Sequence, residues 1–374
     1  MKKIVGMVAA LAVATSAFAV DLNSMIQIDG DAMNYSEAGG FKALDVKDYD
    51  PQGTSDYVWK MSATTDKAGA EIWYYSTGSG NLAKDSTLQN YSLWFKPIDS
   101  LKVTIGSVDY GSALKPQFGW WAYNAELASY GIGVDYTYDA LSLSLALAPG
   151  AGNYWFDSSA EGYKKIGNFW FDARYQTNYG LAQIYVAKGA AVHPHGFTGW
   201  NASDLAVGAA WGNNPYMQNG YFVDVAATFS DGKKIVPADV WAADADTEDG
   251  LAFEKVVSQI YGQYFIDSFG VQFINVLKYT PKSVQKGSNT GWAWAECDAE
   301  FKYGFELKAR YAMEGWTPYI QINGYSIMDK SMEIDLGCDT SVGACSINAY
   351  VAIPVAFEDY SFSFSVPVEF TVNL

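Results

Sequence analysis

The last segment of the chain alternates strictly between apolar and polar residues. Its apolar positions are Phe362, Phe364, Val366, Val368, Phe370, Val372 and Leu374. Because successive side chains of a strand point to opposite faces, this period of two predicts a β-strand with one apolar face and excludes an α-helix. Such a strand suits a soluble β-sandwich, with the apolar face turned to the core. It equally suits a membrane β-barrel, with that face turned to lipid and the polar face to the lumen.

The same alternation returns in segments that are separated by turn-forming residues. These predicted strands cover residues 132–138, 141–147, 169–175, 182–186 and 221–229. A two-residue loop at Asp139-Ala140 would pair Tyr138 with Leu141 and keep the apolar rows of both strands on one face. Segments of about ten alternating residues between turns are typical of transmembrane β-barrels.

The first residues have the three regions of a secretory signal peptide. Lys2 and Lys3 form a basic start, residues 4–14 are apolar apart from Gly6, and Ala17-Phe18-Ala19 matches a cleavage site. We therefore expect cleavage after Ala19 and a mature chain of residues 20–374. Beyond Ala19 no apolar run approaches the roughly 20 residues that a transmembrane helix needs, so any membrane crossing would use strands.

The charge balance excludes one class of partner. The chain has 24 Lys and Arg residues against 41 Asp and Glu residues, a formal charge of −17. A chain this acidic repels nucleic acid and anionic surfaces. Only 17% of its residues are charged while 49% are hydrophobic, which excludes a disordered chain and leaves ample apolar surface to bury.

The final strand resembles that of bacterial outer-membrane β-barrel proteins. In that class the last strand alternates in this way and ends in an aromatic residue that the barrel-assembly machinery reads. This chain departs from the pattern at its end, which is Leu374, and at Pro367, which interrupts the polar row.

A second resemblance covers residues 91–106. The sequence Tyr-Ser-Leu-Trp-Phe-Lys-Pro-Ile-Asp-Ser-Leu-Lys-Val-Thr-Ile-Gly is similar to the aromatic-Lys-Pro turn and following strand of porin-type outer-membrane proteins, including those of spirochaetes. We expect a turn at residues 96–100 that sets Leu93 opposite Val103 and Phe95 opposite Leu101. Trp94 would then face Lys102.

These resemblances imply the fold class. We expect an all-β protein: one closed antiparallel transmembrane β-barrel of about 16 strands, with 14–18 acceptable, in a single domain of residues 20–374. Closure is expected because an open sheet would expose its edges to lipid. The expected long loops are residues 30–54, 107–129, 149–167, 188–203 and 230–252. The faces of residues 253–264 cannot be assigned from the pattern, and neither can the side of the membrane on which each loop lies.

Strand parity also predicts which residues would line a pore. Two strands at 293–301 and 305–311, joined by Lys302-Tyr303-Gly304, would set Asp298 opposite Lys308 and Glu296 opposite Arg310, and opposite charges facing each other across a strand pair are favourable. Together with polar-face residues of other strands, the expected pore lining is Lys102, Asp135, Asp172, Arg174, Glu296, Asp298, Lys308 and Arg310.

The three cysteines fit export to a compartment that permits disulfides. Cys338 and Cys345 flank a turn-like stretch and are the candidates for a disulfide, which would leave Cys297 unpaired. A zinc site would need more ligands nearby, and the two histidines, His193 and His195, lie far from the cysteines in the sequence. We expect neither a metal nor a cofactor.

The function that these features favour is an outer-membrane porin for passive diffusion of small hydrophilic solutes. No nucleophile elbow, histidine-containing zinc motif or phosphate-binding glycine loop is present, so no enzyme activity is expected. The implied partners are outer-membrane lipid, solutes and the barrel-assembly machinery, and a homotrimer stays open. Two other functions fit the sequence: a surface adhesin or structural antigen barrel without transport, and a secreted carbohydrate-binding β-sandwich. The stretch Phe118–Trp121 fits a sugar platform, a constriction loop or an exposed loop equally well.

Overall fold

The computed structural model describes most of the chain as β-structure. The described residues are 21–45, 57–76, 86–116, 125–150, 154–160, 165–192, 204–213, 218–231, 233–234, 251–286, 294–325, 327–358 and 362–373. Among these residues no helix is long and apolar enough to cross a membrane. The expected signal peptide and the stretch Phe118–Trp121 lie outside the described residues.

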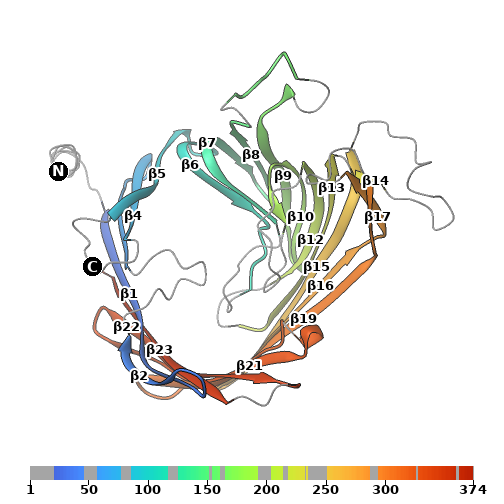
Figure 1. Ribbon diagram of the computed structural model, residues 1–374. Coiled ribbons are helices and arrows are strands. Elements are labelled where there is room, and N and C mark those ends of the chain that lie inside the picture. Colours follow the sequence, from blue (N-terminus) through green and yellow to red (C-terminus); the bar gives the residue numbers. More distant parts are fainter. Residues whose placement is uncertain are drawn as a thin grey trace.

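The described strands form one large antiparallel sheet and one small sheet (Figure 1). Their bounds are β1 Asp21–Ser36, β2 Gly40–Asp45, β3 Tyr57–Thr64, β4 Ala68–Ser76, β5 Ser86–Ile98, β6 Leu101–Gly111, β7 Ala125–Tyr138, β8 Leu141–Ala148, β9 Asn168–Thr177, β10 Gly180–Lys188, β11 Ala191–Val192, β12 Leu205–Asn213, β13 Gly220–Asp231, β14 Lys233–Lys234, β15 Leu251–Ile266, β16 Phe269–Thr280, β17 Ser283–Lys286, β18 Trp294–Cys297, β19 Glu300–Tyr311, β20 Trp316–Asn323, β21 Ser331–Val342, β22 Cys345–Ala356 and β23 Ser363–Asn373. One 3-10 turn, η4, covers Ile327–Asp329.

Over the described residues, the large sheet has 20 strands, more than the roughly 16 that the sequence predicts. Two of them are short additions: β2 folds back on β1, and β11 has two residues that pair with β7. The others pair in chain order from β3 to β23. β23 then pairs with β1 along Met25–Ser36, and β1 pairs with β3 along Asp21–Ile28. Figure 1 shows these strands arranged in a ring.

The hairpin expected at Asp139-Ala140 is confirmed, and the structure has a second hairpin with a two-residue turn between β9 and β10. Tyr138 pairs with Leu141 between β7 and β8, and Thr177 pairs with Gly180 between β9 and β10. Asp139 has a φ of 53°, the left-handed conformation that tight hairpin turns require. The expected strands at 221–229 and at the end of the chain are also present, as β13 and β23.

The hairpin expected between 293 and 311 is wrong. Strand β19 runs without a turn from Glu300 to Tyr311 and pairs with β16 on one side and β20 on the other. Lys308 therefore lies opposite Gln272 and Gln321, and the expected pairing of Asp298 with Lys308 does not form. The glycine in Lys302-Tyr303-Gly304 suggested a turn, but pairing with β16, which sets Lys278 opposite Lys302 and Val276 opposite Gly304, keeps the segment extended.

The hairpin of β5 and β6 forms with a different register. Phe95 pairs with Val103 and Leu93 with Ile105, two residues away from the expected partners. The pairing shifts between Phe95 and Ile98, which pairs with Leu101. The turn is therefore tighter than the sequence suggests, and the bulge absorbs one extra residue on β5.

The faces of residues 253–264 resist assignment because the buried inner face carries both apolar and polar side chains: Val257, Gln259, Tyr261 and Gln263 are 1%, 0%, 1% and 5% exposed. A β-bulge adds an irregularity at the start of the segment. In the pairing of β13 with β15, Thr228 lies opposite Lys255 and Phe229 opposite Phe253, so Glu254 is the extra residue. An inserted residue reverses the alternation of faces beyond it. Beyond Glu254 the pairing with β13 continues without a further shift from Lys255 to Gln263.

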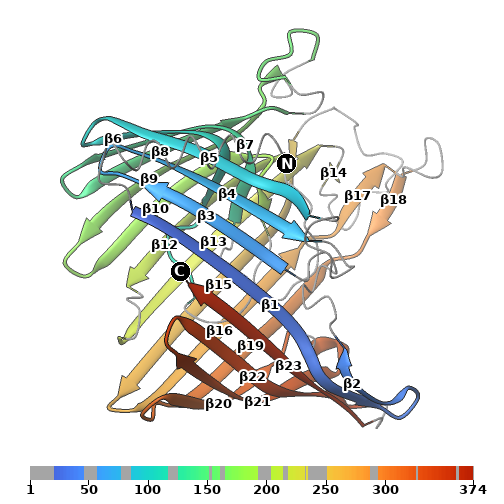
Figure 2. The same cartoon turned by 90° about the vertical axis from the view of Figure 1, so that its left-hand side faces the viewer.

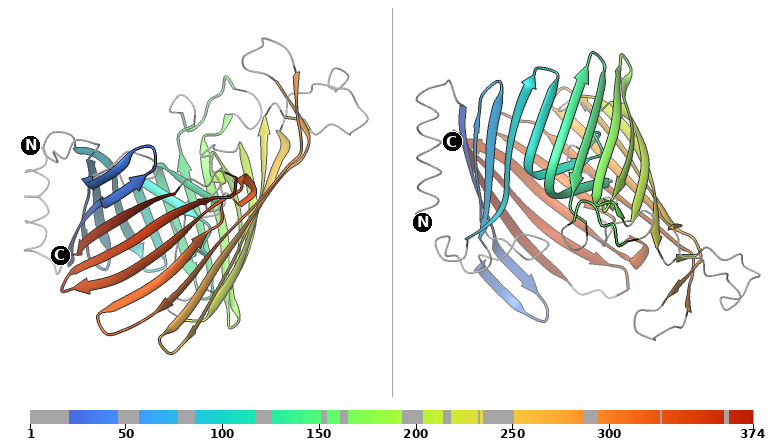
Figure 3. Two further views of the ribbon diagram at one scale, coloured as in Figure 1. Left: turned by 60° about the horizontal axis from the view of Figure 1, so that its bottom comes forward. Right: turned by 90° about the horizontal axis from the view of Figure 1, so that it is seen from above.

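From β3 to β23, the tight hairpin turns lie at one end of the sheet and the long connections at the other (Figure 2). The three-residue turn between β1 and β2 is the exception and lies at the end with the long connections. Hairpin turns such as those between β7 and β8 or β21 and β22 share one end with the start of β1 and the end of β23. The small sheet of β14, β17 and β18 extends from the opposite end, beside β15 and β16 (Figures 2 and 3). Two expected loops, 30–54 and 107–129, are too long, because β1, β2, β6 and β7 extend into them.

The expected disulfide is absent. Cys338 and Cys345 are both free. Cys338 lies on β21 and Cys345 begins β22, and these two strands pair with Val342 opposite Cys345 and Cys338 opposite Ala349. Four residues of strand separate the cysteines, about 13 Å at roughly 3.3 Å per residue. A disulfide needs Cα atoms within about 7 Å.

This separation predicts the outcome of thiol labelling. Protein that is unfolded without reductant and treated with a maleimide is expected to carry the label on both Cys338 and Cys345, as read by peptide mass spectrometry. A sample treated first with reductant is the control and should give the same labelling at these two positions. Label that appears only after reduction would contradict the observed register.

Candidate functional site

The large sheet exposes apolar side chains on its outer face and buries polar side chains on its inner face. On the outer face Leu145, Phe171 and Ile184 are 37%, 41% and 63% exposed. On the inner face their chain neighbours Ser144, Asp172 and Gln183 are 5%, 0% and 2% exposed. A soluble sandwich buries the apolar face instead, so this arrangement is the one that a transmembrane β-barrel uses.

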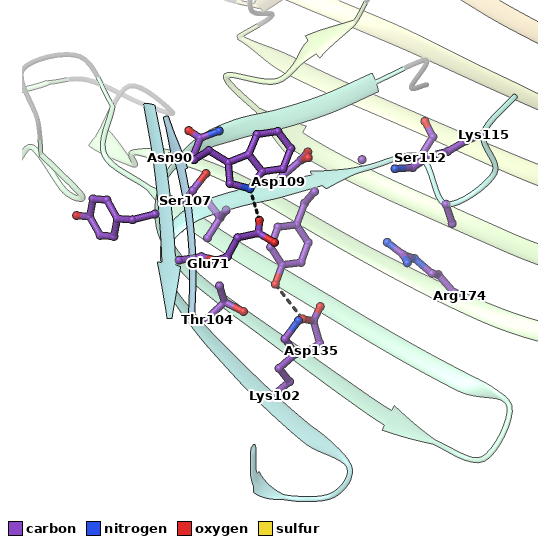
Figure 4. A pocket seen from close by; sticks show the side chains of 17 residues that line it. Glu71, Asn90, Lys102, Thr104, Ser107, Asp109, Ser112, Lys115, Asp135 and Arg174 are labelled. Carbon is purple, nitrogen blue, oxygen red and sulfur yellow. Dashed lines mark hydrogen bonds between the residues drawn. The ribbon is translucent and has the colours of Figure 1, made fainter. Parts of the chain in front are cut away.

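A cavity of about 620 Å³ lies against the inner face of β4 to β7 (Figure 4). Its lining carries both signs of charge, with carboxylates at Glu71, Asp109 and Asp135 and cations at Lys102, Lys115 and Arg174. Hydroxyl and amide groups from β5 and β6 complete the wall, including Asn90, Ser92, Thr104 and Ser107. Figure 4 shows Arg174 and Lys115 across the cavity from Glu71 and Thr104.

The charges on β3 and β4 form one interacting group. The Lys60 ammonium lies 2.8 Å from Glu71 Oε2, and the Trp73 indole N–H donates to Glu71 Oε1 at 2.6 Å. Lys60 Nζ also lies 4.4 Å from the centre of the Trp73 ring, within cation–π range. These contacts hold the Glu71 carboxylate in one position at the wall.

Asp135 is held from β6. The Tyr110 hydroxyl donates to Asp135 Oδ2 at 3.0 Å, and Lys102 occupies the register position opposite Asp135. Lys102 Nζ lies 5.5 Å from the centre of the Trp94 ring. The wall of β5 to β7 therefore presents one carboxylate and one cation side by side.

Asp172 connects the cavity to the interior behind it. Arg174 donates to Asp172 Oδ2 from Nε at 2.9 Å and from Nη2 at 2.6 Å. Gln183 Nε2 donates to the same oxygen at 2.6 Å, while Gln183 Oε1 accepts from the backbone N–H of Ala113 at 2.7 Å. The segment that follows β6 is thus tied to β9 and β10, and it carries Lys115, whose pKa is lowered by burial and raised in part by Asp109 and Glu126.

A second polar group lies on the inner face of β19 to β23. Lys308 Nζ lies 3.8 Å from the centre of the Tyr319 ring, and Asn348 donates to the Tyr319 hydroxyl at 3.1 Å. Nearby, Asn323 Nδ2 donates to Asp335 Oδ2 at 2.9 Å. A cavity of about 450 Å³ lies here at the end with the short turns, and Asp339 and Glu369 are among its lining residues.

The structure brings three of the eight expected pore-lining residues, Lys102, Asp135 and Arg174, to the larger cavity. Asp172 lies behind that cavity and is fully buried. Lys308 and Arg310 share the inner face of β19, where Arg310 packs 5.0 Å from the centre of the Phe265 ring. Asp298 is exposed in the connection before β19. Glu296 lies on β18, and its side chain is not among those that the structure describes.

Other cavity residues were not singled out from the sequence. Glu71 lines the cavity, and Lys60 is its ion-pair partner. Both lie on polar positions of alternating strands, so strand parity applied to residues 57–76 would have found them. Lys115 has no such signal, because it lies in a connection whose inward position depends on contacts with β10.

Comparison with solved structures agrees with this architecture. OccK3 (OpdO) of Pseudomonas aeruginosa superposes with a TM-score of 0.51 at 8% identity, covering 95% of each chain. OccAB4 of Acinetobacter baumannii gives a TM-score of 0.51 at 9% identity, covering 95% of this chain and 98% of that one. No family model matches the chain. No curated protein sequence matches it either. The chain therefore has the fold of the bacterial outer-membrane porins.

Proposed function

We propose that this protein is an outer-membrane porin that lets small hydrophilic solutes diffuse passively through a water-filled interior. The observation that carries the proposal is the reversed polarity of the sheet. Ile184 on the outer face is 63% exposed, while charged groups such as Glu71 and Arg174 line a cavity inside. Walls with fixed charges of both signs select solutes in an aqueous path without covalent chemistry.

The proposal includes a closed barrel of 18 strands in a single domain of residues 20–374. Of the 20 strands described in the large sheet, β2 and β11 are short additions, which leaves 18 in series. The pairing of β1 with both β23 and β3 supports closure. An even number of strands is normal for single-chain bacterial barrels, and closure leaves no unpaired edge in lipid.

The proposal also includes an orientation and a route to the membrane. Short turns of such barrels face the periplasm and longer loops the outside, which places the small sheet of β14, β17 and β18 on the cell surface. The signal peptide of residues 1–19 would direct Sec export across the inner membrane of a diderm bacterium, and the barrel-assembly machinery would insert the chain among outer-membrane lipids. A homotrimer is the arrangement to test by crosslinking in detergent.

Cations are expected to pass more readily than anions. The strands β20 to β23 contain no Lys or Arg, while Glu333, Asp335, Asp339 and Glu369 lie on them. The cations of the interior are concentrated on β19 and around the larger cavity. The net negative charge along one wall lowers the energy of a cation in the aqueous path.

Planar-bilayer recording tests this function. Insertion of refolded mature protein is expected to raise the conductance in discrete steps. Under a salt gradient, the reversal potential should have the sign that indicates preferential passage of cations. Mature protein that is correctly folded by the heat-modifiability gel but produces no steps would exclude the porin. That outcome would favour an adhesin or structural barrel. Recovery of the native protein in the soluble fraction without detergent would favour a secreted carbohydrate-binding protein.

A further inference from the structure

The inner face of the sheet is unevenly buried. From β8 to β16 its side chains are almost completely covered: Ala146, Trp170, Ala226 and Ile274 are each 0% exposed, and Val257 is 1% exposed. Polar residues on the same face are covered as well, with Asp224 and Gln259 at 0%. These side chains have no contact with bulk water.

The rest of the inner face is more open. The side chains of Lys60 on β3 and Glu71 on β4 are 29% and 35% exposed. Arg174 on β9, at the edge of the covered region, is 29% exposed. Thr104 on β6 and Asn348 on β22 are half-buried, and each lines one of the two cavities. Water therefore reaches part of the inner face along β3 to β7 and along β20 to β23, on both sides of β1. Other residues of these strands are buried: Val108, Leu127 and Asp335 are 1%, 2% and 4% exposed.

The covered side has the packing of a protein core. Trp170 stacks on Tyr185 with ring centres 4.9 Å apart, and Phe222 stacks on Tyr261 at 5.2 Å. The first pair belongs to a cluster of buried apolar residues that includes Val108 and Val257, and the second to a cluster that includes Leu114. Stacked rings at these distances leave no aqueous gap between them.

Part of this core is built by the segment after β6. Ser112 and Ala125 bond to each other, from Ser112 N to Ala125 O at 3.0 Å and from Ala125 N to Ser112 Oγ at 3.3 Å. Gln183 holds the N–H of Ala113. Leu114, 4% exposed, then packs in the same cluster as Phe222, a residue of β13. The segment thus crosses from β6 toward β10 and β13 inside the sheet.

We propose that the solute path occupies only one side of the interior, bounded by β3 to β7 and β20 to β23, and that the inner face of β8 to β16 is a dry structural core. Gln183 and Asp172 lie at the boundary: they fix the segment of residues 112–115 on one side and Arg174, which faces the path, on the other. Asp172 is a positioning residue and does not line the path. This inference rests on the proposed porin function.

Cysteine accessibility during conduction tests the path. The background is a cysteine-free parent that carries C297A, C338A and C345A. In this parent, Thr104→Cys places a thiol at the larger cavity, and Ala226→Cys places the same group in the covered core. A positively charged methanethiosulfonate reagent added to an open channel is expected to lower the conductance of Thr104→Cys measurably and to leave Ala226→Cys unchanged. After denaturation both variants should react completely by mass spectrometry, which shows that each thiol is intact.

The outcomes separate this inference from the function. A cysteine-free parent without conductance would refute the porin function itself. A conducting parent in which Ala226→Cys reacts as fast as Thr104→Cys, or in which Thr104→Cys does not react, would overturn the one-sided path while the porin function stands.

The anchor at Gln183 gives a second test. Gln183→Leu keeps the size of the side chain but removes its bonds to Ala113 and Asp172, and it is expected to raise single-channel conductance and to make Ala226→Cys reactive. Gln321→Leu is the matched control, because Gln321 lies on the inner face of β20 and bonds to Asn323 at 3.0 Å. Equal conductance and reactivity in the two folded variants would overturn the role of Gln183.

Discussion

Replacing Leu145 by arginine is expected to prevent stable insertion of the folded protein into lipid. Leu145 lies within β8, is 37% exposed on the outer face and pairs with Val134 and Phe171. An arginine on the lipid face of a barrel costs about 2–4 kcal/mol near the bilayer midplane and less toward the interfaces. The free energy of unfolding in lipid vesicles, from urea titration followed by the heat-modifiability gel, measures this loss.

Thr104→Arg is the matched control for the opposite face. Thr104 lies on β6, is half-buried and lines the larger cavity, where an added guanidinium stays hydrated. This variant is expected to fold close to wild type and to change conductance instead. Equal stability of the two arginine variants in lipid would refute the assignment of the outer face.

The second large effect is expected from Phe222→Ala inside the sheet. Phe222 is 0% exposed and stacks on Tyr261 at 5.2 Å in a cluster with Ile274. Emptying a packed site of this size costs about 3–5 kcal/mol, from lost transfer energy and from the remaining cavity. If the inner face of β13 were bathed by water, the loss would be much smaller. Urea titration of the refolded protein in detergent micelles measures the difference.

Val223→Ala provides the comparison on the neighbouring position. Val223 points to the outer face, is 38% exposed and pairs with Trp211 and Ile260. Because Val223 lacks close-packed neighbours on the outer face, Val223→Ala is expected to lower the free energy of unfolding clearly less than Phe222→Ala does. A loss for Phe222→Ala no larger than for Val223→Ala would contradict a dry core on the inner face.

The local strand pattern predicted much of the fold correctly. The hairpin at Asp139-Ala140 forms in the expected register, because a two-residue loop leaves only one pairing that keeps both apolar rows together. The final strand also forms as expected. The pattern failed in β15, where apolar Val257 and Tyr261 share the buried inner face with polar residues. It also failed in β19, where pairing with β16 keeps Gly304 in a continuous strand.

The candidate site was predicted less completely than the fold. Strand parity identified Lys102 and Asp135 because each lies on the polar face of a regular strand. Strand parity also selected Asp172. This residue does lie on the inner face, but neighbouring side chains bury it completely, so it has no contact with water. Parity reports only the direction of a side chain, while access to solvent depends on what else fills the space in front of it.

The alternation of residues along the chain was enough by itself to establish strands with one apolar and one polar face, because a side chain's direction follows from its covalent position in an extended backbone. The pairing of β1 with β23, the free state of Cys338 and Cys345 and the burial of one side of the interior were decided only in the tertiary structure. Each depends on contacts between segments far apart in the sequence, such as Ala113 with Gln183. The free energy of such contacts depends on which other surfaces fold against them, and no local pattern encodes that.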